Sequence, residues 1–484
     1  MDTQLVVLGA GPGGYAAAFL AADLGMKVTL VEQEPRLGGV CLLRGCIPSK
    51  ALLHVAKVMS EARHLADWGV QFSAPKVDLA AMRGRKEKVI STLTGGLKQL
   101  AKQRKVTVVH ARAQLQDSRT LRLERAALTP GSSPAGGKGE EDADDRVRFE
   151  HCILATGSTA ATTAGLDVKS DRVMNSKTAL DLPDVPKSLL VVGGGYIGLE
   201  MGSVYAALGS RVSVVEMTDG LLPGVDRDLV KPLQKRLEKQ FDGIYLNTKV
   251  VSLKEKKDGL EVTFEGDADN KIQRFDRVLV SVGRRPNSGG LGLENTKVEV
   301  DGRGFVKVDR QQRTADAGIL AIGDVAGEPM LAHKAAHEGK VAVEVLAGHP
   351  ATFEPRAIPA VVFTDPEIAW AGLTETEAKR QNRNVEVARF PWAASGRAQA
   401  AGRTEGVTKW LVDPESERVL GCGIVGHGAG DLISEAVLAI EMGAAIRDLT
   451  DSIHPHPTLS ETLAAAAEVQ LGTATDLYRP KRNR

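Results

Sequence analysis

The pattern of apolar and glycine-rich segments near the N-terminus predicts a strand, a tight turn, a helix and a second strand. The first strand is the apolar run 5–8 and the second is 28–31. Between them, residues 9–14 read Gly-Ala-Gly-Pro-Gly-Gly and contain the spacing GxGxxG. Glu32 follows the second strand, eighteen residues after the last glycine of the turn (32 − 14).

The glycines Gly9, Gly11 and Gly14 fit the requirements of a dinucleotide-binding turn. They permit the tight turn, the approach of a pyrophosphate to bare backbone, and close packing of the helix on the strand. The helix N-terminus then faces the phosphates, and the Glu32 carboxylate can accept from ribose hydroxyls. GxGxxG alone is weak evidence, but the strand before it, the helix after it and the acid at this distance favour a dinucleotide site.

The same unit occurs a second time. The apolar strand 189–192 precedes Gly193-Gly-Gly195-Tyr-Ile-Gly198, and the strand 212–215 leads to Glu216, again eighteen residues after the last glycine (216 − 198). Two such units in one chain predict two bound dinucleotides.

The remaining pattern places further elements around these units. Residues 54–104 have helical periodicity, 106–123 alternate as strands do, and 129–145 lack any apolar period and are expected to form a surface loop. Two more apolar strands run into glycine, at Gly283 and at Gly323-Asp324.

From about residue 352 the glycine motifs cease, and strand-like runs alternate with the helical segments 374–381, 430–442 and 460–470. That mixture suits an α+β dimerisation domain. We therefore predict an α/β fold with two Rossmann-like dinucleotide-binding domains and a C-terminal α+β dimerisation domain.

The length and net charge of the chain indicate the number of its domains and the kinds of partner to expect. A chain of 484 residues should divide into about three domains. Its 62 basic and 61 acidic residues leave a net charge of +1, which gives no reason to expect nucleic acid or a membrane as partner. We find no signal peptide and no apolar run of about 18 residues, so we expect a cytoplasmic protein.

Two of the four cysteines, Cys41 and Cys46, stand five positions apart with Gly45 between them. Gly45 permits a sharp turn, so the thiols can close a small disulfide ring. Apolar positions after Cys46 have helical spacing, which places this thiol near a helix N-terminus, where the dipole favours a thiolate. No nearby His or Cys completes a metal site, and we predict none. The spacing alone fits either a redox pair or two core cysteines.

Near the C-terminus, His454-Pro-His456-Pro-Thr458-Leu-Ser460-Glu461 forms a second candidate site. The prolines stiffen the loop, Thr458 or Ser460 can cap the following helix, and Glu461 lies within reach of a histidine. Considered alone, this segment fits a capping loop with solvated histidines better than a catalytic site.

Together these features resemble the pyridine nucleotide disulfide oxidoreductases, and within them the dihydrolipoamide dehydrogenases. The resemblance covers nearly the whole chain. It is most specific at 38–58, 194–217, 321–332, 390–398 and 454–461.

The resemblance implies an FAD-dependent enzyme that oxidises protein-bound dihydrolipoamide and reduces NAD⁺. In such an enzyme Cys41 is the interchange thiol, Cys46 the charge-transfer thiol, and His456, oriented by Glu461, the acid/base catalyst. FAD is then held by Gly9, Gly11, Gly14, Glu32, Gly39, Lys50, Ala113, Gly157, Ser158, Asp324 and Ala332. NAD is held by Gly193, Gly195, Tyr196, Ile197, Gly198, Glu216, Val250 and Gly283.

The resemblance also implies a homodimer that serves the lipoyl domains of 2-oxoacid dehydrogenase or glycine cleavage complexes. The expected domains are 1–155 and 284–351 for FAD, 156–283 for NAD, and 352–484 for dimerisation.

Three departures from the family pattern stand out. Leu43-Arg44 replaces the usual Asn-Val between the thiols, and a cation there can lower a thiolate pKa. Pro455 stands where Ala is usual, and Ala111 and Ala113 stand where Gly is common near the FAD adenine.

Three other functions fit the sequence less well. An NADPH-dependent reductase of the glutathione reductase type conflicts with Glu216, because its carboxylate repels a 2′-phosphate. A mercuric reductase needs paired cysteines at the C-terminus, and 478–484 has none. A structural flavoprotein subunit predicts a lost thiol or histidine, and both are present.

Overall fold

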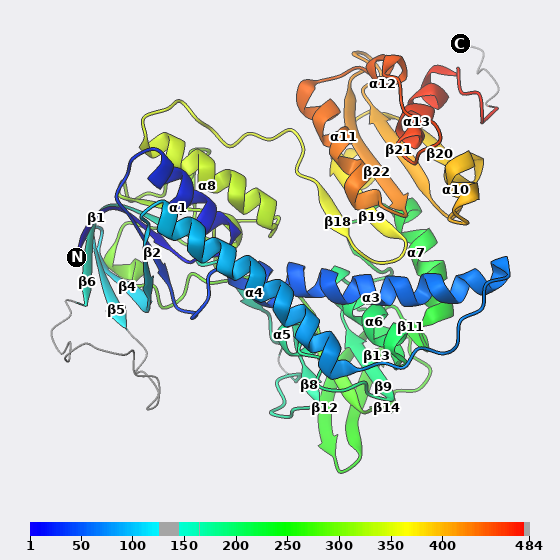
Figure 1. Ribbon diagram of the computed structural model, residues 1–484, viewed down its shortest axis with the longest axis horizontal. Coiled ribbons are helices and arrows are strands. Elements are labelled where there is room, and N and C mark those ends of the chain that lie inside the picture. The colour runs from blue at the N-terminus through cyan, green and yellow to red at the C-terminus, as the bar shows by residue number, and fades with distance from the viewer. Residues whose placement is uncertain (125–144, 164, 479–484) are drawn as a thin grey trace. The chain divides into compact units, whose positions relative to one another are not determined.

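The computed structural model describes residues 1–124, 145–163 and 165–478. It contains two compact units, which share the chain in alternating segments (Figure 1). The first unit comprises Met1–Ala51, Ala80–Ala161 and Gly283–Glu354, and the second comprises Leu52–Leu79, Thr162–Val282 and Pro355–Arg484. The predicted loop at 129–145 lies, except for Asp145, outside the described residues.

Within its described part, the first unit is built on a seven-stranded sheet. Its parallel strands are β3 (Thr107–His110), β2 (Val28–Glu32), β1 (Asp2–Leu8), β6 (Arg146–Leu154) and β17 (Ile319–Ala321). The antiparallel strands β5 (Thr120–Glu124) and β4 (Arg112–Asp117) extend one edge. The central strands are buried on both faces, which explains why they are continuous apolar runs.

Two helices of this unit, α1 (Pro12–Asp23) and α8 (Ala332–Leu346), lie side by side (Figure 1). Glycines permit their close approach: a Cβ on Gly13 would lie 2.9 Å from the Ala335 oxygen, and one on Gly339 would lie 2.8 Å from the Gly13 oxygen. Helices α2 (Gly39–Arg44), α3 (Cys46–His64) and α4 (Leu79–Gln103) follow the second strand, the last two separated by a short 3-10 turn (Leu65–Trp68) and an irregular segment.

The run Gly39–Trp68 is long enough and apolar enough to cross a membrane by length and composition, with a mean hydropathy of 1.2 over its best window. It is not one continuous helix, however, because α2 ends at Arg44, Gly45 interrupts the helix, and α3 begins at Cys46. The run also carries Arg44 and Lys50. A broken helix with internal charges is unfavourable in a bilayer core, so we do not interpret the run as a membrane span.

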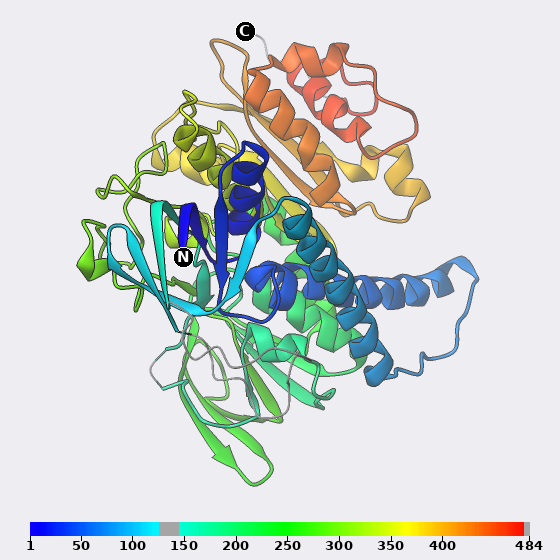
Figure 2. The same cartoon turned by 60° about the vertical axis from the view of Figure 1, so that its left-hand side comes forward.

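The second unit repeats the nucleotide-binding architecture. A parallel sheet has the order β11 (Gly243–Tyr245), β10 (Arg211–Val215), β9 (Ser188–Val192), β15 (Arg277–Val280), β8 (Val173–Met174). Helices α5 (Ser176–Leu180), α6 (Tyr196–Leu208) and α7 (Arg227–Gln240) accompany it. An antiparallel sheet of β12 (Thr248–Lys256), β13 (Gly259–Gly266) and β14 (Ile272–Phe275), not predicted from the sequence, projects as the green hairpin in Figure 2.

The C-terminal part of this unit is an antiparallel sheet with helices, as predicted. The sheet order is β18 (Ala360–Val362), β19 (Glu367–Gly372), β22 (Val419–Gly426), β21 (Val407–Val412), β20 (Glu386–Pro391). Helices α11 (Ala429–Met442) and α13 (Glu461–Leu471) pack on it, and α9 (Glu375–Arg380), α10 (Gly396–Ala400) and α12 (Ile446–Asp451) connect the rest. Trp392 and Trp410 are the largest fully buried side chains of its core.

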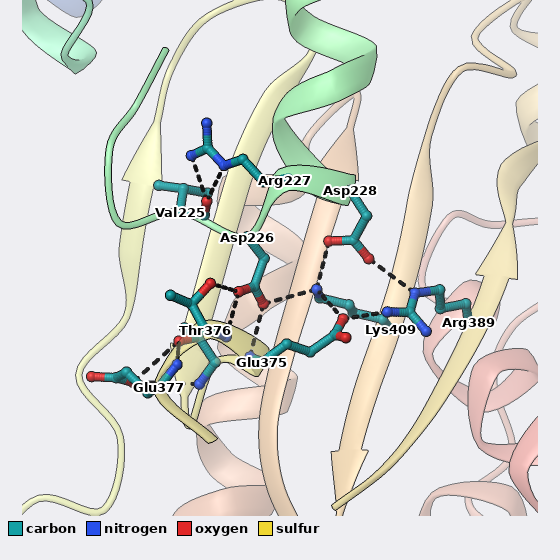
Figure 3. A network of polar contacts seen from close by, with 10 residues as sticks. Val225, Asp226, Arg227, Asp228, Glu375, Thr376, Glu377, Arg389 and Lys409 are labelled. Atoms are coloured by element: carbon teal, nitrogen blue, oxygen red, sulfur yellow. Dashed lines mark hydrogen bonds and ion pairs between the residues drawn. The ribbon is translucent and has the colours of Figure 1, made fainter. Parts of the chain in front are cut away.

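A buried ion network joins α7 to this C-terminal sheet (Figure 3). The Nζ atom of Lys409 lies 2.8 Å from Asp226, 2.7 Å from Asp228 and 2.7 Å from Glu375. Arg389 pairs with Asp228 and Glu375 as well. The three carboxylates could geometrically hold a metal ion, but the ammonium group already lies between them.

Candidate functional site

The first glycine turn is shaped by contacts that exclude any side chain. Gly9 has φ +106°, and a Cβ there would lie 2.3 Å from the Ala155 oxygen. A Cβ on Gly14 would lie 1.8 Å from the Gly9 oxygen. Gly11 is the N-cap of α1 and gives it no side-chain hydrogen bond, so the first amides of the helix face outward as bare donors. This is the geometry that a pyrophosphate needs.

The second turn has the same construction. Gly193 has φ +102°, and a Cβ there would lie 2.6 Å from the Ser281 oxygen, while one on Gly198 would lie 2.4 Å from the Gly193 oxygen. Gly195 caps α6 without a side-chain bond. Tyr196 and Ile197 form the first helical turn, and Tyr196 is 42% exposed.

The two predicted ribose-binding acids are held in matching ways. One carboxylate oxygen of Glu32 accepts from the Ala10 amide at 2.8 Å and the other from Glu34 at 2.9 Å. In Glu216 the corresponding donors are the amides of Gly194 at 2.7 Å and Thr218 at 2.9 Å. Both side chains are buried. Because each oxygen retains further acceptor capacity, both carboxylates can still accept from sugar hydroxyls.

These features fit two dinucleotides. Each site combines a bare helix N-terminus, glycines that leave room beside the backbone, and a carboxylate fixed in advance by two amides. The residues present therefore suit one dinucleotide in each unit, and the resemblance predicts FAD for the first and NAD for the second.

Other predicted FAD residues lie around the first turn. A Cβ on Gly39 (φ +58°) would lie 2.6 Å from the Gly11 Cα. Gly157 (φ +70°) faces open space, and Ala332 begins α8, whose N-cap Leu331 gives no side-chain bond. Ala113 differs from these, because it lies on the edge strand β4 and contributes its methyl group to the core of the sheet.

Ser158 forms side-chain hydrogen bonds with Asp324 and Arg284. Its hydroxyl donates to Asp324, and it accepts from the Arg284 Nε at 2.7 Å. One Asp324 oxygen is thus already engaged. Sequence reasoning had not singled out Arg284, although it directly follows the predicted Gly283.

The two remaining residues predicted to bind NAD, Gly283 and Val250, have different surroundings. Gly283 (φ +124°) has open space where a Cβ would be. Val250 lies on β12, opposite Phe264, and packs against the apolar core there.

The thiol pair lies where α2 meets α3. Cys41 belongs to α2, and Cys46 is the first residue of α3, as its predicted place at a helix N-terminus requires. Gly45 makes the junction possible, because a Cβ there would lie 2.9 Å from the Val40 oxygen. The side chains of Cys41 and Cys46 interact, so the two sulfurs are neighbours.

Local charges and burial set the protonation of this pair. The hydrogen bond to Cys46, and then burial, raise the pKa of Cys41 far above its ordinary value, while the charge of Lys50 acts to lower it. Tyr15 on α1 lies close enough that both thiols, after burial itself, raise its pKa. Sequence reasoning missed Tyr15, since a lone tyrosine on a helix gives no signal.

The expected effect of Arg44 on the thiols is not supported. Its guanidinium lies 2.7 Å from the Glu34 carboxylate, and Lys50, not Arg44, is the cation that acts on Cys41. Pairing with a carboxylate cancels most of the field that a lone arginine exerts on a neighbour.

The C-terminal loop brings its predicted pair together. Nδ1 of His456 lies 2.9 Å from Oε1 of Glu461, and Oε2 of Glu461 accepts from the Thr458 amide at 2.6 Å. Burial acts to raise the pKa of Glu461, but these two hydrogen bonds outweigh it and hold the pKa below its ordinary value. The predicted side-chain cap is wrong, because Ser460 occupies the N-cap of α13 without a capping bond.

Two protein-family models match the chain, and both agree with this geometry. Residues 3–339 match the model of the pyridine nucleotide-disulphide oxidoreductases, and residues 358–467 match the dimerisation domain of the same family. The chain belongs to the pyridine nucleotide-disulphide oxidoreductases. The predicted family, the fold class and the FAD and NAD cofactors are thereby confirmed.

Members of this family with curated names resemble the chain over its full length. Dihydrolipoyl dehydrogenase of Haemophilus influenzae is 50% identical over 99% of this chain and 98% of its own. The enzyme of that name from Vibrio cholerae is 48% identical with the same coverage.

Solved structures agree on the fold. LpdA from Mycobacterium tuberculosis superposes with a TM-score of 0.86 at 26% identity, covering 96% of this chain and 99% of that one. The HOCl-induced flavoprotein disulfide reductase RclA from Escherichia coli gives 0.83 at 27%, covering 97% and 99%.

Proposed function

We propose that this protein is a dihydrolipoyl dehydrogenase, which oxidises dihydrolipoamide and reduces NAD⁺ through FAD and the Cys41–Cys46 pair. The observation that carries the proposal is the pair of adjacent thiols at the start of α3, in the unit that holds the first dinucleotide turn. Full-length relatives of that name support the same activity.

The two thiols have different roles, which follow from their different tendencies to form a thiolate. The neighbouring Cys46 and burial raise the pKa of Cys41, which disfavours a thiolate on that sulfur. The helix N-terminus at Cys46 stabilises a thiolate there. We therefore assign Cys46 as the thiol that faces the flavin and Cys41 as the one that exchanges with substrate. FAD, when bound, supplies the two-electron transfer between this pair and the nicotinamide.

His456 serves as the base. With Nδ1 bound to Glu461, Nε2 is the nitrogen that can take a proton from a dihydrolipoyl thiol. The thiolate so formed attacks the Cys41 sulfur of the disulfide, and Cys46 leaves as thiolate. The second substrate thiol then attacks the substrate sulfur of the mixed disulfide while its proton passes to the departing Cys41 sulfur, so Cys41 leaves as a thiol. Lipoamide leaves with its disulfide closed, and two electrons remain on the pair.

Glu216 makes NAD⁺ the preferred acceptor. Its buried carboxylate already accepts from two amides, so it cannot turn away from a 2′-phosphate without losing them. The repulsion would disfavour NADP⁺.

The dimerisation domain makes the protein a homodimer. Its surface carries exposed apolar side chains at Leu438, Met442 and Ile453, the last of which directly precedes the His454–Glu461 loop. Such residues suit burial against a second copy.

We propose that the His456–Glu461 pair of one protomer completes the thiol site of its partner. We also propose that the substrates are lipoyl domains of 2-oxoacid dehydrogenase or glycine cleavage complexes, and that the protein acts in the cytoplasm. FAD would be held by 1–155 and 284–351, and NAD by 156–283.

Steady-state NADH formation from dihydrolipoamide tests the proposal. We expect turnover with NAD⁺, weak turnover with NADP⁺, and loss of most activity in His456→Gln and Glu461→Gln. His349→Gln, at an exposed site after α8, is the matched control and should behave as wild type. Full activity of His456→Gln would refute the assignment of the base.

A further inference from the structure

The position of Glu461 depends on the first turn of α13. Glu461 is the first residue of that helix, and the N-cap Ser460 makes no side-chain capping bond. The His456 side chain is 79% exposed, so packing restrains it little and its orientation rests on the bond to Glu461. Whatever fixes the start of α13 therefore fixes the acid/base pair.

A buried chain of hydrogen bonds reaches the residue next to Glu461. Nε1 of Trp392 donates to Oγ1 of Thr408 at 2.9 Å, and Oγ1 of Thr408 lies 2.8 Å from Oγ1 of Thr462. The Thr462 hydroxyl also donates to the Leu459 oxygen at 2.7 Å. Trp392, Thr408 and Thr462 are all at most 1% exposed.

The protons of this chain have one arrangement that satisfies every group. Thr462 has a single hydroxyl proton, which it donates to Leu459, so Thr408 must donate to Thr462. Thr408 then accepts from Trp392, which is a donor only. The chain thus runs in one direction, from the indole through both hydroxyls to the backbone before Glu461.

A second indole holds the following residue. Nε1 of Trp410 donates to the Leu463 oxygen at 2.9 Å, and both residues are fully buried. Trp392 is itself clamped, because a Cβ on Gly406 or on Gly426 would lie 2.3 Å from its ring. The first turn of α13 is therefore attached to the rigid sheet at two successive residues.

We propose that Thr408 and Thr462, with Trp410, are positioning residues that hold Glu461 and thereby orient His456. This inference rests on the proposed function. Without the anchors, α13 can still form, but its first turn can shift against the sheet. A displaced carboxylate orients the His456 ring less well and stabilises its protonated form less.

The test compares Thr462→Val, which removes the hydroxyl at nearly constant volume, with Thr462→Ser, which keeps it. We expect Thr462→Val to lower kcat for dihydrolipoamide by about three- to tenfold, the effect of one buried hydrogen bond. The acid limb of its pH profile should move to lower pH. Thr462→Ser should restore both. NADH oxidation by ferricyanide, which needs the flavin but neither the thiols nor His456, should not change.

Thr3→Val is the matched control, since Thr3 is also buried and donates to a backbone oxygen, that of Lys27, at 2.8 Å. It should lower stability without moving the pH profile. Trp410→Phe, which removes the donor to Leu463 together with part of the buried ring, provides a second variant should Thr462→Val fold poorly.

An unchanged pH profile and kcat in folded Thr462→Val, or in Trp410→Phe if the former does not fold, would overturn the positioning role. A different result would refute the proposed function. If His456→Gln and Glu461→Gln retained full activity, the base assignment would be wrong whatever the threonine variants showed.

Discussion

The ion network around Lys409 allows a quantitative prediction for the substitution Lys409→Met. The ammonium group is 1% exposed and contacts three carboxylates, of which Asp226 is the most buried. Breaking a buried pair by removing one partner costs about 3–5 kcal/mol. Asp226 keeps hydrogen bonds from the amides of Glu375 and Thr376 and from the Thr376 hydroxyl, so we place the cost near the lower limit, at about 3 kcal/mol.

The cost should depend on pH with a definite sign. Burial acts to raise the pKa of Asp226, but its bonds to Lys409 and Thr376 outweigh this and lower the pKa to about 2. The stabilisation is therefore complete above the ordinary aspartate pKa of about 3.9 and is lost as the pH falls toward 2. In Lys409→Met the carboxylates repel one another, and protonation relieves that repulsion. The difference between the variant and wild type should shrink on acidification.

Thermal unfolding at fixed protein concentration and with excess FAD measures both effects. About 3 kcal/mol corresponds to a Tm lowered by about 6–12 °C for a unit of this size. Lys379→Met, the same substitution at an exposed position of α9, should change stability by no more than about 0.5 kcal/mol. A deficit in Lys409→Met that is equally large at pH 7 and near pH 3 would refute the electrostatic explanation and point to packing.

Three further predictions concern the redox and nucleotide sites. Two-electron reduction of the wild type should give a long-wavelength thiolate-to-flavin absorption band; Cys41→Ser should show the band without reduction and Cys46→Ser should lack it, whereas the opposite pattern would exchange the two roles. Replacing Glu216 with a neutral residue should relax the preference for NAD⁺ by on the order of 1 to 3 kcal/mol, measured as the ratio of kcat/KM values, and equal values for both nucleotides in the wild type would contradict the reading of Glu216. Mixing Cys46→Ser chains with His456→Gln chains should restore up to about a quarter of wild-type activity if sites are shared across a two-fold dimer; mixtures as inactive as their parents would mean that each chain carries a complete site.

The sequence was most informative where backbone geometry leaves no choice of residue. A Cβ on Gly14 would lie 1.8 Å from the Gly9 oxygen, so the fold requires glycine at this position. The spacing of the glycines in each turn therefore indicates the fold directly. The same holds for the acids at the ends of β2 and β10, whose distance from the glycines follows from the length of one helix and one strand. For this reason both dinucleotide units could be predicted without a structure.

Long-range polar partners could not be predicted in this way. Arg44 was expected to act on the thiols, but Glu34, on a different element, neutralises it. Thr408 and Thr462 are 54 residues apart, and each is an ordinary residue in its own segment. Hydrogen bonds of this kind leave no periodic signal, because only the tertiary fold brings their partners together.

The clamped Trp392 has a consequence for how this sequence can vary. Its ring occupies the space that side chains at Gly406 and Gly426 would need, although these positions lie on different strands or turns. A larger residue at either glycine is therefore compatible with the fold only after Trp392 has become smaller, and that change also removes the donor to Thr408. The three positions should evolve as one unit, and relatives that lack the tryptophan should be those in which Gly406 is free to differ, whereas the φ of +155° at Gly426 favours glycine in any case.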